Sequence, residues 1–334
     1  MICLAWVFIT LTIGNNSIKA DEFYFHKVYI PFRKLWYQIF GGIDIPLLYL
    51  WLIFVVLVVI LIVKECKRIT IWGFHIAFMI LAHFLYFYIA WGFNYNRLSI
   101  SERLKLKEPI NKLEFESEVD HAISQVNSIR SKLNHDLDFD WNTLKNDMEQ
   151  SVSLFLKQNQ LQSLEKVSSK ALFPRGSLLV LSTAGVYWPF AGESMIDAGL
   201  HPIEVPFTMA HELAHGMGWT DEGECNWIAY ESCIRSKLLR CNYSGNLSYL
   251  KYLLHNIPEV DSLLYTHSVN KLSKEVRSDL DDIRRQHDKY PDFIPGIRNA
   301  LYNWYLKSNQ VSSGLESYNE IIMLSINFRK KRTG

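Results

Sequence analysis

The sequence has few cysteines and almost no net charge, and each shortage excludes a class of protein. Its 334 residues include only five cysteines, too few for a disulfide framework. The formal net charge is +1 and no long basic stripe dominates the chain, so we expect no nucleic-acid partner. The basic run at residues 329–332 is typical of a solvated tail.

Three of the cysteines, Cys225, Cys233 and Cys241, lie close together, but their spacing matches no zinc-ribbon pattern. If Cys225 and Cys233 share one helix they are about 12 Å apart, too far for a disulfide bond. We therefore expect small packing residues, and the spacing leaves a Cys233–Cys241 bridge open.

Apolar residues are concentrated in the first third of the chain. Residues 45–63 carry no charge, and residues 71–93 are interrupted only by two histidines and two glycines. Each run approaches the roughly 20 residues that a transmembrane helix needs. The short charged segment 64–68 predicts a helical hairpin with its turn in the cytoplasm. Aromatic residues mark the far ends of both runs, where interfacial belts are expected: Trp36, Tyr37, Trp91, Phe93 and Tyr95.

A third apolar stretch lies at residues 2–13. It fits a signal peptide with a weak cleavage position at Ala20, or a transmembrane helix over about residues 2–19. We favour the helix, because no positive charge precedes the stretch. With its N-terminus inside, three spans would leave residues 94–334 outside the cytoplasm, although Lys27, Arg33 and Lys34 would then also lie outside.

After residue 93 the composition becomes that of a water-soluble, mostly helical domain. Helical spacing of apolar residues predicts amphipathic helices at residues 113–133 and 141–156. Further helices are predicted at residues 222–239, 274–287, 296–307 and 314–327. Short strands are predicted at residues 178–181, 185–188 and 203–205.

Residues 211–215 read His-Glu-Leu-Ala-His, the HExxH pattern of zinc hydrolases. On a helix, His211 and His215 project from one face one turn apart, where two imidazoles can bind one zinc ion. Glu212 lies about 100° round the helix and can act as the catalytic base toward a water that zinc acidifies. Because the flanking residues are apolar, two structural histidines without a partner would be costly here.

A catalytic zinc needs a third protein ligand and one open position. The candidates downstream are Asp221, Glu222, Glu224 and Glu231. If Asp221 caps a second helix, Glu224 is either a capping-box residue or the third ligand. Glu231 lies two turns further along nearly the same face, and spacing alone does not choose between Glu224 and Glu231.

Three segments carry a resemblance to a known family: residues 185–193, which read GVYWPFAGE, residues 206–230 around the HExxH pattern, and residues 302–318. They resemble an uncharacterised bacterial membrane family, domain-of-unknown-function 3810, which pairs transmembrane helices with an HExxH domain. The resemblance covers nearly the whole chain and implies that Glu224 is the third zinc ligand. Two departures, Gly216 in place of a glutamine and Cys225 in place of an alanine, touch no proposed ligand.

Residues and resemblance together predict a mainly α membrane protein of the bacterial cytoplasmic (inner) membrane. We expect a membrane region at residues 1–93 with helices near 2–19, 45–63 and 71–93. An α+β zincin-like domain with a small sheet is expected at residues 94–334, outside the cytoplasm.

The expected function is that of a multi-pass, membrane-anchored zinc metallopeptidase that cleaves a peptide or protein substrate. Residues 185–190 fit a sheet edge that pairs with an extended peptide, or an ordinary core strand. Tyr305 and Tyr318 are candidate oxyanion donors, and nothing in the spacing selects either. Two other functions stay open: a zinc amidohydrolase of the cell envelope, and a non-catalytic zinc-binding scaffold or sensor. An intramembrane protease is excluded, because the segment around His211 is too polar and too short to span a bilayer.

Overall fold

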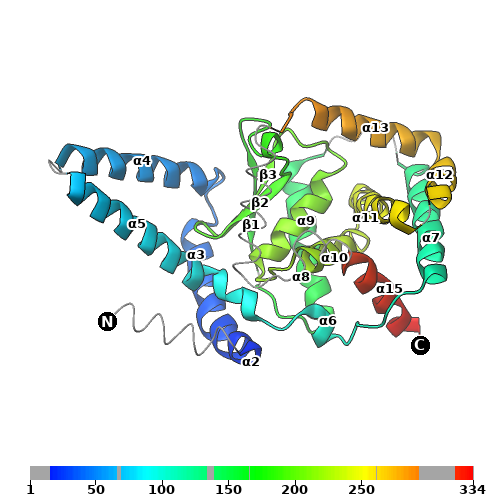
Figure 1. Cartoon of the computed structure of the whole chain (residues 1–334), viewed down its shortest axis with the longest axis horizontal. Helices are drawn as coiled ribbons and strands as arrows, with labels where there is room; N and C mark the ends of the chain where they lie inside the picture. Colours follow the sequence, from blue (N-terminus) through cyan, green and yellow to red (C-terminus); the bar gives the residue numbers. More distant parts are fainter. Residues whose placement is uncertain are drawn as a thin grey trace.

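The computed structural model describes residues 16–65, 69–133, 139–164, 166–260, 262–292 and 320–333. These residues are mostly helical, with one small sheet. Figure 1 shows a helical hairpin, α4 and α5, that projects from a body in which the sheet lies toward the hairpin and most of the helices lie beyond it. Four predicted features lie outside the described residues: most of the helix near residues 2–19, the helix at 296–307, the segment 302–318 and the tyrosines Tyr305 and Tyr318.

The hairpin consists of α4 (Leu47–Glu65) and α5 (Ile69–Ala90). Each helix contains an apolar window long enough to cross a membrane, Leu47–Lys64 and Trp72–Ala90, and only 6% of each window is buried within the molecule. The core helix of a soluble protein would instead bury its apolar residues. The two apolar runs are confirmed as helices, and their place in a bilayer stays a prediction.

A continuous helical segment precedes the hairpin and packs on the body. Its elements are α2 (Ser17–Lys19), the π-helix η1 (Ala20–Tyr29) and α3 (Ile30–Phe40). Phe25 and Tyr29 belong to the same buried core as Trp91 and Phe93, which follow α5 directly. Trp91 and Phe93 therefore pack inside the body, and the interfacial position predicted for them stays a prediction.

Three short strands form the sheet: β1 (Ser168–Leu172), β2 (Gly185–Trp188) and β3 (Glu193–Asp197). Their order is β1-β3-β2, with β1 parallel and β2 antiparallel to the central β3. The prediction of β2 is confirmed, and β1 and β3 were not predicted. The two strands lack the apolar pattern of buried strands because they contain polar residues. Two of these, Lys170 of β1 and Glu193 of β3, form a buried ion pair across the strands.

Two predicted strands are wrong. Residues 178–181 contain the 3₁₀ helix η3 (Leu179–Leu181), because the carboxylate of Asp197 accepts hydrogen bonds from the backbone N–H groups of Leu178 and Leu179. Residues 203 and 204 lie in the turn that leads into α9, and Val205 is the first residue of that helix.

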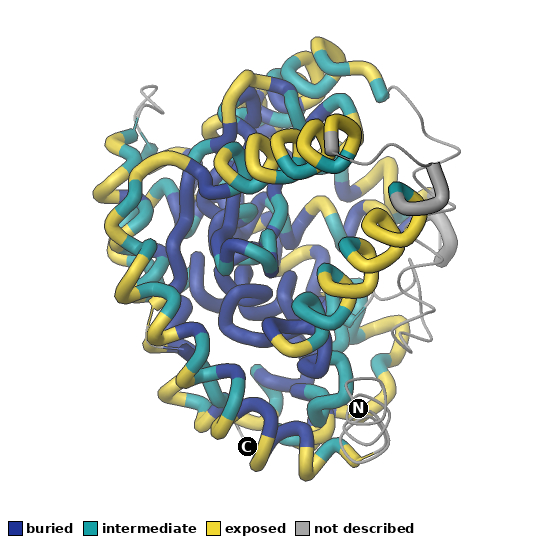
Figure 2. Tube along the Cα trace, turned by 90° about the vertical axis from the view of Figure 1, so that its left-hand side faces the viewer, coloured by how far each residue is buried: buried dark blue, intermediate teal, exposed yellow. Residues whose placement is uncertain are grey.

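Helices make up the rest of the body and enclose a continuous core, seen as dark segments in Figure 2. They are η2 (Gly92–Asn96), α6 (Ile100–Arg103), α7 (Lys112–Arg130), α8 (Trp141–Gln158), α9 (Val205–Gly216), α10 (Glu222–Cys233), α11 (Leu239–Val260), α12 (Ser262–Asn270), α13 (Lys274–Asp288) and α15 (Glu320–Thr333). The helices predicted at residues 113–133, 141–156 and 274–287 are confirmed as α7, α8 and α13.

The helix predicted at residues 222–239 is too long, and α11 and α12 were not predicted. The chain turns after α10, where the Asn242 side chain donates a hydrogen bond to the Ile234 carbonyl at 2.8 Å. Gly245 then lets α11 pack closely on α10, since a Cβ there would lie 2.5 Å from the Cβ of Cys233. Cys225, Cys233 and Cys241 are buried free thiols, so the Cys233–Cys241 bridge does not form.

Candidate metal centre

The two histidines lie on the C-terminal half of α9, which crosses the core of the body. Pro206 occupies the first turn of the helix, where its missing N–H costs nothing. The imidazoles of His211 and His215 face each other, with their Nε2 atoms 3.1 Å apart. The predicted shared face is therefore confirmed. The helix is fixed in place by fully buried residues between and before them: Met209, Ala210, Leu213 and Ala214.

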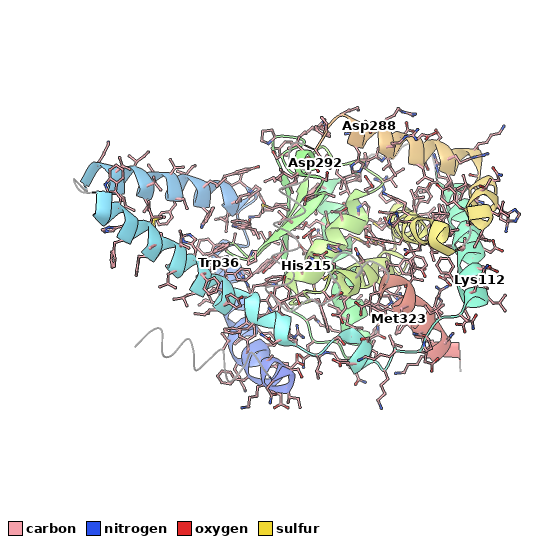
Figure 3. The ribbon with its side chains drawn as sticks, in the orientation of Figure 1. Trp36, Lys112, His215, Asp288, Asp292 and Met323 are labelled. Atoms are coloured by element: carbon pink, nitrogen blue, oxygen red, sulfur yellow. The ribbon has the colours of Figure 1, made fainter. Side chains whose placement is uncertain are left out.

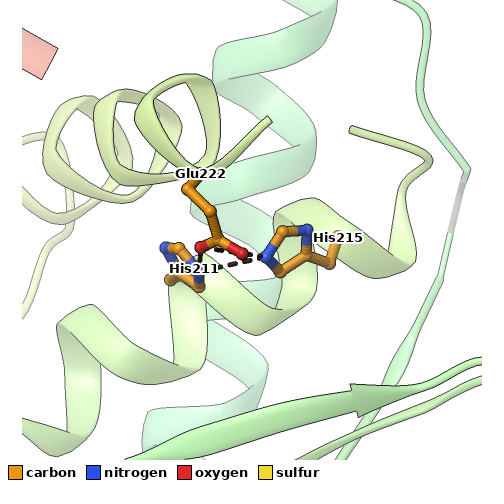
Figure 4. A group of neighbouring side chains, drawn as sticks. All are labelled: His211, His215 and Glu222. Carbon is orange, nitrogen blue, oxygen red and sulfur yellow. Dashed lines mark hydrogen bonds and ion pairs between the residues drawn. The ribbon is translucent and has the colours of Figure 1, made fainter. Parts of the chain in front are cut away.

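Glu222 brings a carboxylate to this pair of histidines. After α9 the chain turns at Gly218, whose φ of +91° suits glycine alone, and Asp221 then caps α10 with its side chain. Glu222 is the first residue of α10. Its Oε2 atom lies 3.2 Å from Nε2 of His211 and 3.7 Å from Nε2 of His215 (Figure 4).

The three donor atoms have the spacing of metal ligands, all lying within 4.8 Å of one another. Ligands bound at zinc distances in a tetrahedron lie about 3.3 Å apart. The separations of 3.1, 3.2 and 3.7 Å in this group are close to that value. Two imidazoles and one carboxylate are also the ligand set of many catalytic zinc sites that keep a fourth position open. The residues present therefore fit a zinc ion.

The surroundings of His215 orient its ring for binding. Its Nδ1 atom lies 2.9 Å from the carbonyl oxygen of Trp219, so Nδ1–H donates there and Nε2 is the nitrogen that faces the other donor atoms. Metal-binding histidines usually have such a partner, which fixes the tautomer. The Cys225 thiol lies 3.3 Å from the same Nδ1 and packs against the ring. In the described part of the chain, Nδ1 of His211 is buried without a hydrogen-bond partner.

Burial and charge act in opposite directions on the donor groups. Burial lowers the pKa of His215, but the nearby Cys225 and Glu222 outweigh it and hold that pKa well above its usual value. Burial raises the pKa of Glu222, but the two histidines outweigh it and hold that pKa well below its usual value. Glu222 is thus ionised at neutral pH and available as an anionic ligand.

Glu212 is buried between α9 and β2, beside the donor group. Burial raises the pKa of its carboxyl, and the lowering by His211 and His215 offsets this only in part. A raised pKa suits a general base at neutral pH. The strand leaves room for the side chain, because a Cβ on Gly185 would lie 2.9 Å from Cγ of Glu212. The backbone of Tyr187 also forms a hydrogen bond with Glu212.

The structure does not bring the other three predicted candidates into this group of donors: Asp221 caps α10, and Glu224 and Glu231 lie elsewhere. Glu224 is buried on the opposite side of α10, where its carboxylate accepts a hydrogen bond from the backbone N–H of Ile100. Glu231 pairs with Arg235, which lies in the turn just after α10. Neither belongs to the described group of donors. The assignment of Glu224 as a ligand stays a prediction from the resemblance. In the structure, the carboxylate beside the two histidines is that of Glu222.

Three backbone carbonyls at the end of α9 are held by segments that flank the hairpin. The hydrogen bonds are Trp91 Nε1 to His215 at 3.0 Å, Tyr29 Oη to Gly216 at 2.7 Å and Arg97 Nη1 to Gly218 at 2.7 Å. The sequence carried no signal for these contacts, because each joins residues far apart in the chain. They connect the base of the hairpin directly to the end of the HExxH helix. Figure 3 labels His215 inside the body.

A family model described as "Protein of unknown function (DUF3810)" matches residues 24–326. No curated protein and no solved structure matches the chain.

Proposed function

This chain belongs to the DUF3810 family of proteins of unknown function, and we propose that it is a membrane-anchored zinc metallopeptidase. The observation that carries the proposal is the convergence of His211, His215 and Glu222 within 4.8 Å, with the buried carboxyl of Glu212 beside them. The donor set is suited to zinc, since imidazole and carboxylate are both common zinc ligands.

Each residue has a role in this proposal. His211, His215 and Glu222 hold the ion, which when bound would polarise a carbonyl and lower the pKa of water. Glu212 accepts a proton from the attacking water and returns it to the leaving amine. The Trp219 carbonyl keeps the His215 ring oriented.

A polypeptide substrate is favoured by the position of β2 at the edge of the sheet. An exposed strand edge pairs with an extended chain through backbone hydrogen bonds. β2 lies directly against Glu212, since Gly185 contacts its side chain. A chain paired with this edge would therefore place a peptide bond near the base.

The membrane part of the proposal is supported by the hairpin. The apolar windows of α4 and α5 are long enough to span a bilayer and almost entirely unburied. The charged residues 64–68, which separate the two apolar runs in the sequence, favour a cytoplasmic turn. If the hairpin spans the bacterial cytoplasmic membrane with its turn inside, the body and its proposed metal centre lie outside the cytoplasm.

The test uses the full chain in detergent, loaded with zinc, and a mixture of peptides of diverse sequence. New termini are identified by mass spectrometry. We expect cleavage that Glu212→Gln reduces by about 100-fold or more while the zinc content stays unchanged. Glu116→Gln, on the outer face of α7, is the matched control and should cleave normally. A zinc-loaded protein that produces no new termini would refute the peptidase proposal.

A further inference from the structure

The turn between β2 and β3 is seated between the two helices of the hairpin. Trp188 packs edge-on against Trp51 of α4 at 5.3 Å between ring centroids. Phe190 stacks on Tyr86 of α5 at 5.7 Å, and Tyr86 also donates a hydrogen bond to the Phe190 carbonyl at 3.0 Å. The sheet is thus attached to the hairpin through this turn (residues 188–192).

The attachment lies near the body end of both apolar windows. Trp51 and Tyr86 are each four residues from the ends of the windows Leu47–Lys64 and Trp72–Ala90, or about 6 Å along a helix. Aromatic side chains at this depth are typical of the interface between lipid and water. If the hairpin spans a bilayer, the turn lies at the membrane surface.

The edge of β2 that does not pair with β3 runs from this turn to the proposed catalytic base, Glu212. The N–H of Asp197 donates to the Ala184 carbonyl, so Ala184 and Asp197 form a hydrogen-bonded antiparallel pair. Because such pairs alternate along the ladder, the backbone groups of Gly185 and Tyr187 point away from β3. Within the described residues, the Gly185 N–H and the carbonyls of Gly185 and Tyr187 have no backbone partner outside the sheet.

The distance along this edge is short. Three residue steps separate Trp188 from Gly185, which is about 10 Å for an extended strand. Glu212 meets the strand inside this interval, since it contacts both Gly185 and the backbone of Tyr187. A chain that pairs with β2 and is cut beside Glu212 is therefore held very near the base of the hairpin.

We propose that the substrates are membrane-attached polypeptides, cut within about five residues of the bilayer surface. The inference rests on the proposed peptidase function and names its substrate class. The edge accepts an extended segment that emerges from the membrane beside α4 and α5, and the aromatic turn sets how far from the lipid the cut falls. A polypeptide without an anchor can pair with the same edge in any register.

The experiment uses the full chain in phospholipid vesicles and one model substrate in two forms. The anchored form is a transmembrane helix followed by a randomised segment of about 20 residues, which extends about 65 Å. The free form is the same randomised segment without the helix. Cut positions are mapped by mass spectrometry, with Glu212→Gln as the inactive control.

In the anchored form we expect cuts to cluster within about five residues of the helix end, whereas cuts in the free form should be spread along the segment. Inserting a spacer after the helix should leave the cuts next to the membrane rather than shift them with the randomised segment. Cuts spread evenly along the anchored segment would overturn this inference and leave the peptidase intact. Absence of Glu212-dependent cleavage in both forms would overturn the peptidase function itself.

Discussion

The turn between α9 and α10 (residues 216–221) has two different sides. On the side of the histidines the polar side chains converge and remain partly exposed to solvent, whereas on the side of Arg97 they are paired and buried. The side chains of His211 and Glu222 keep exposures of 13% and 21%. Those of Arg97 and Asp21, which hold the opposite side, keep 3% and 6%. The side with His211 and Glu222 is thus suited to bind a ligand, and the side with Arg97 and Asp21 holds the turn in place.

The two glutamates near the start of α10 show the same division. Glu222 points to the histidines at 3.2 Å from His211, and Glu224 points to the backbone of Ile100. Residues two apart on a helix face different directions, so one turn of α10 serves both sides. We therefore expect substitutions on one side to affect metal binding and substitutions on the other to affect stability.

The largest effect is expected for His211→Ala, which removes a ligand from the open side. Zinc affinity should fall by more than about 100-fold, since even changes behind a ligand cost 10–100-fold. A competition titration with a zinc chelator measures the change. His201→Ala, in the loop before α9, is the control and should bind zinc normally. Equal affinity in His211→Ala and the unmodified protein would contradict the assignment of this side.

The next effect is expected for Arg97→Ala on the buried side. Arg97 bonds Asp21 at 2.8 Å and the Gly218 carbonyl at 2.7 Å, and its guanidinium lies 3.6 Å from the Phe25 ring centroid. Losing one partner of a buried ion pair costs about 3–5 kcal/mol of unfolding free energy. Denaturant unfolding measures the loss.

The control for Arg97→Ala is Arg284→Ala, since the Arg284 side chain is 71% exposed and its pair with Asp281 lies on the surface. Its effect should stay below about 1 kcal/mol. Similar losses for both arginines would remove the distinction between the buried side of the turn and the surface.

A smaller effect on stability is expected for Glu224→Ala. The substitution leaves the N–H of Ile100 buried without its acceptor, which costs about 1–3 kcal/mol. Zinc affinity, measured in parallel by the chelator titration, should remain normal. If Glu224→Ala lost zinc but kept its stability, Glu224 would be a metal ligand rather than a residue that stabilises the turn.

The smallest effect is expected for Trp91→Phe, which keeps a six-membered aromatic ring but removes the pyrrole part of the indole, and with it the N–H that donates to the His215 carbonyl. Unfolding free energy should fall by about 1 kcal/mol, and zinc affinity by no more than about tenfold. Trp141→Phe, at the start of α8, is the matched control. A larger drop in zinc affinity than in His211→Ala would contradict a purely supporting role.

Features that depend on local sequence were predictable. The apolar runs of α4 and α5 and the His211-to-His215 spacing needed only a helical period. Strands β1 and β3 were not predictable, because Lys170 and Glu193 give them no apolar alternation and their pairing crosses the sheet. Helix α11 was also not predictable from local sequence, because Gly245 within it is unfavourable for a helix and is explained only by the close contact with Cys233.

The third ligand shows the limit of spacing as a guide. Which glutamate of α10 reaches the histidines depends on how the turn at Gly218 sets the second helix against the first. That turn is fixed by Tyr29 and Arg97, which lie more than 100 residues earlier in the chain. No local pattern carries that information, so the sequence could name Glu222 as a candidate without choosing it.

The most direct test is the zinc content of the full chain beside two variants of equal size, Glu222→Gln and Glu224→Gln. We predict about one zinc ion per chain in the unmodified protein and in Glu224→Gln, and strong loss in Glu222→Gln. Zinc retained in Glu222→Gln and lost in Glu224→Gln would contradict the His211, His215 and Glu222 site.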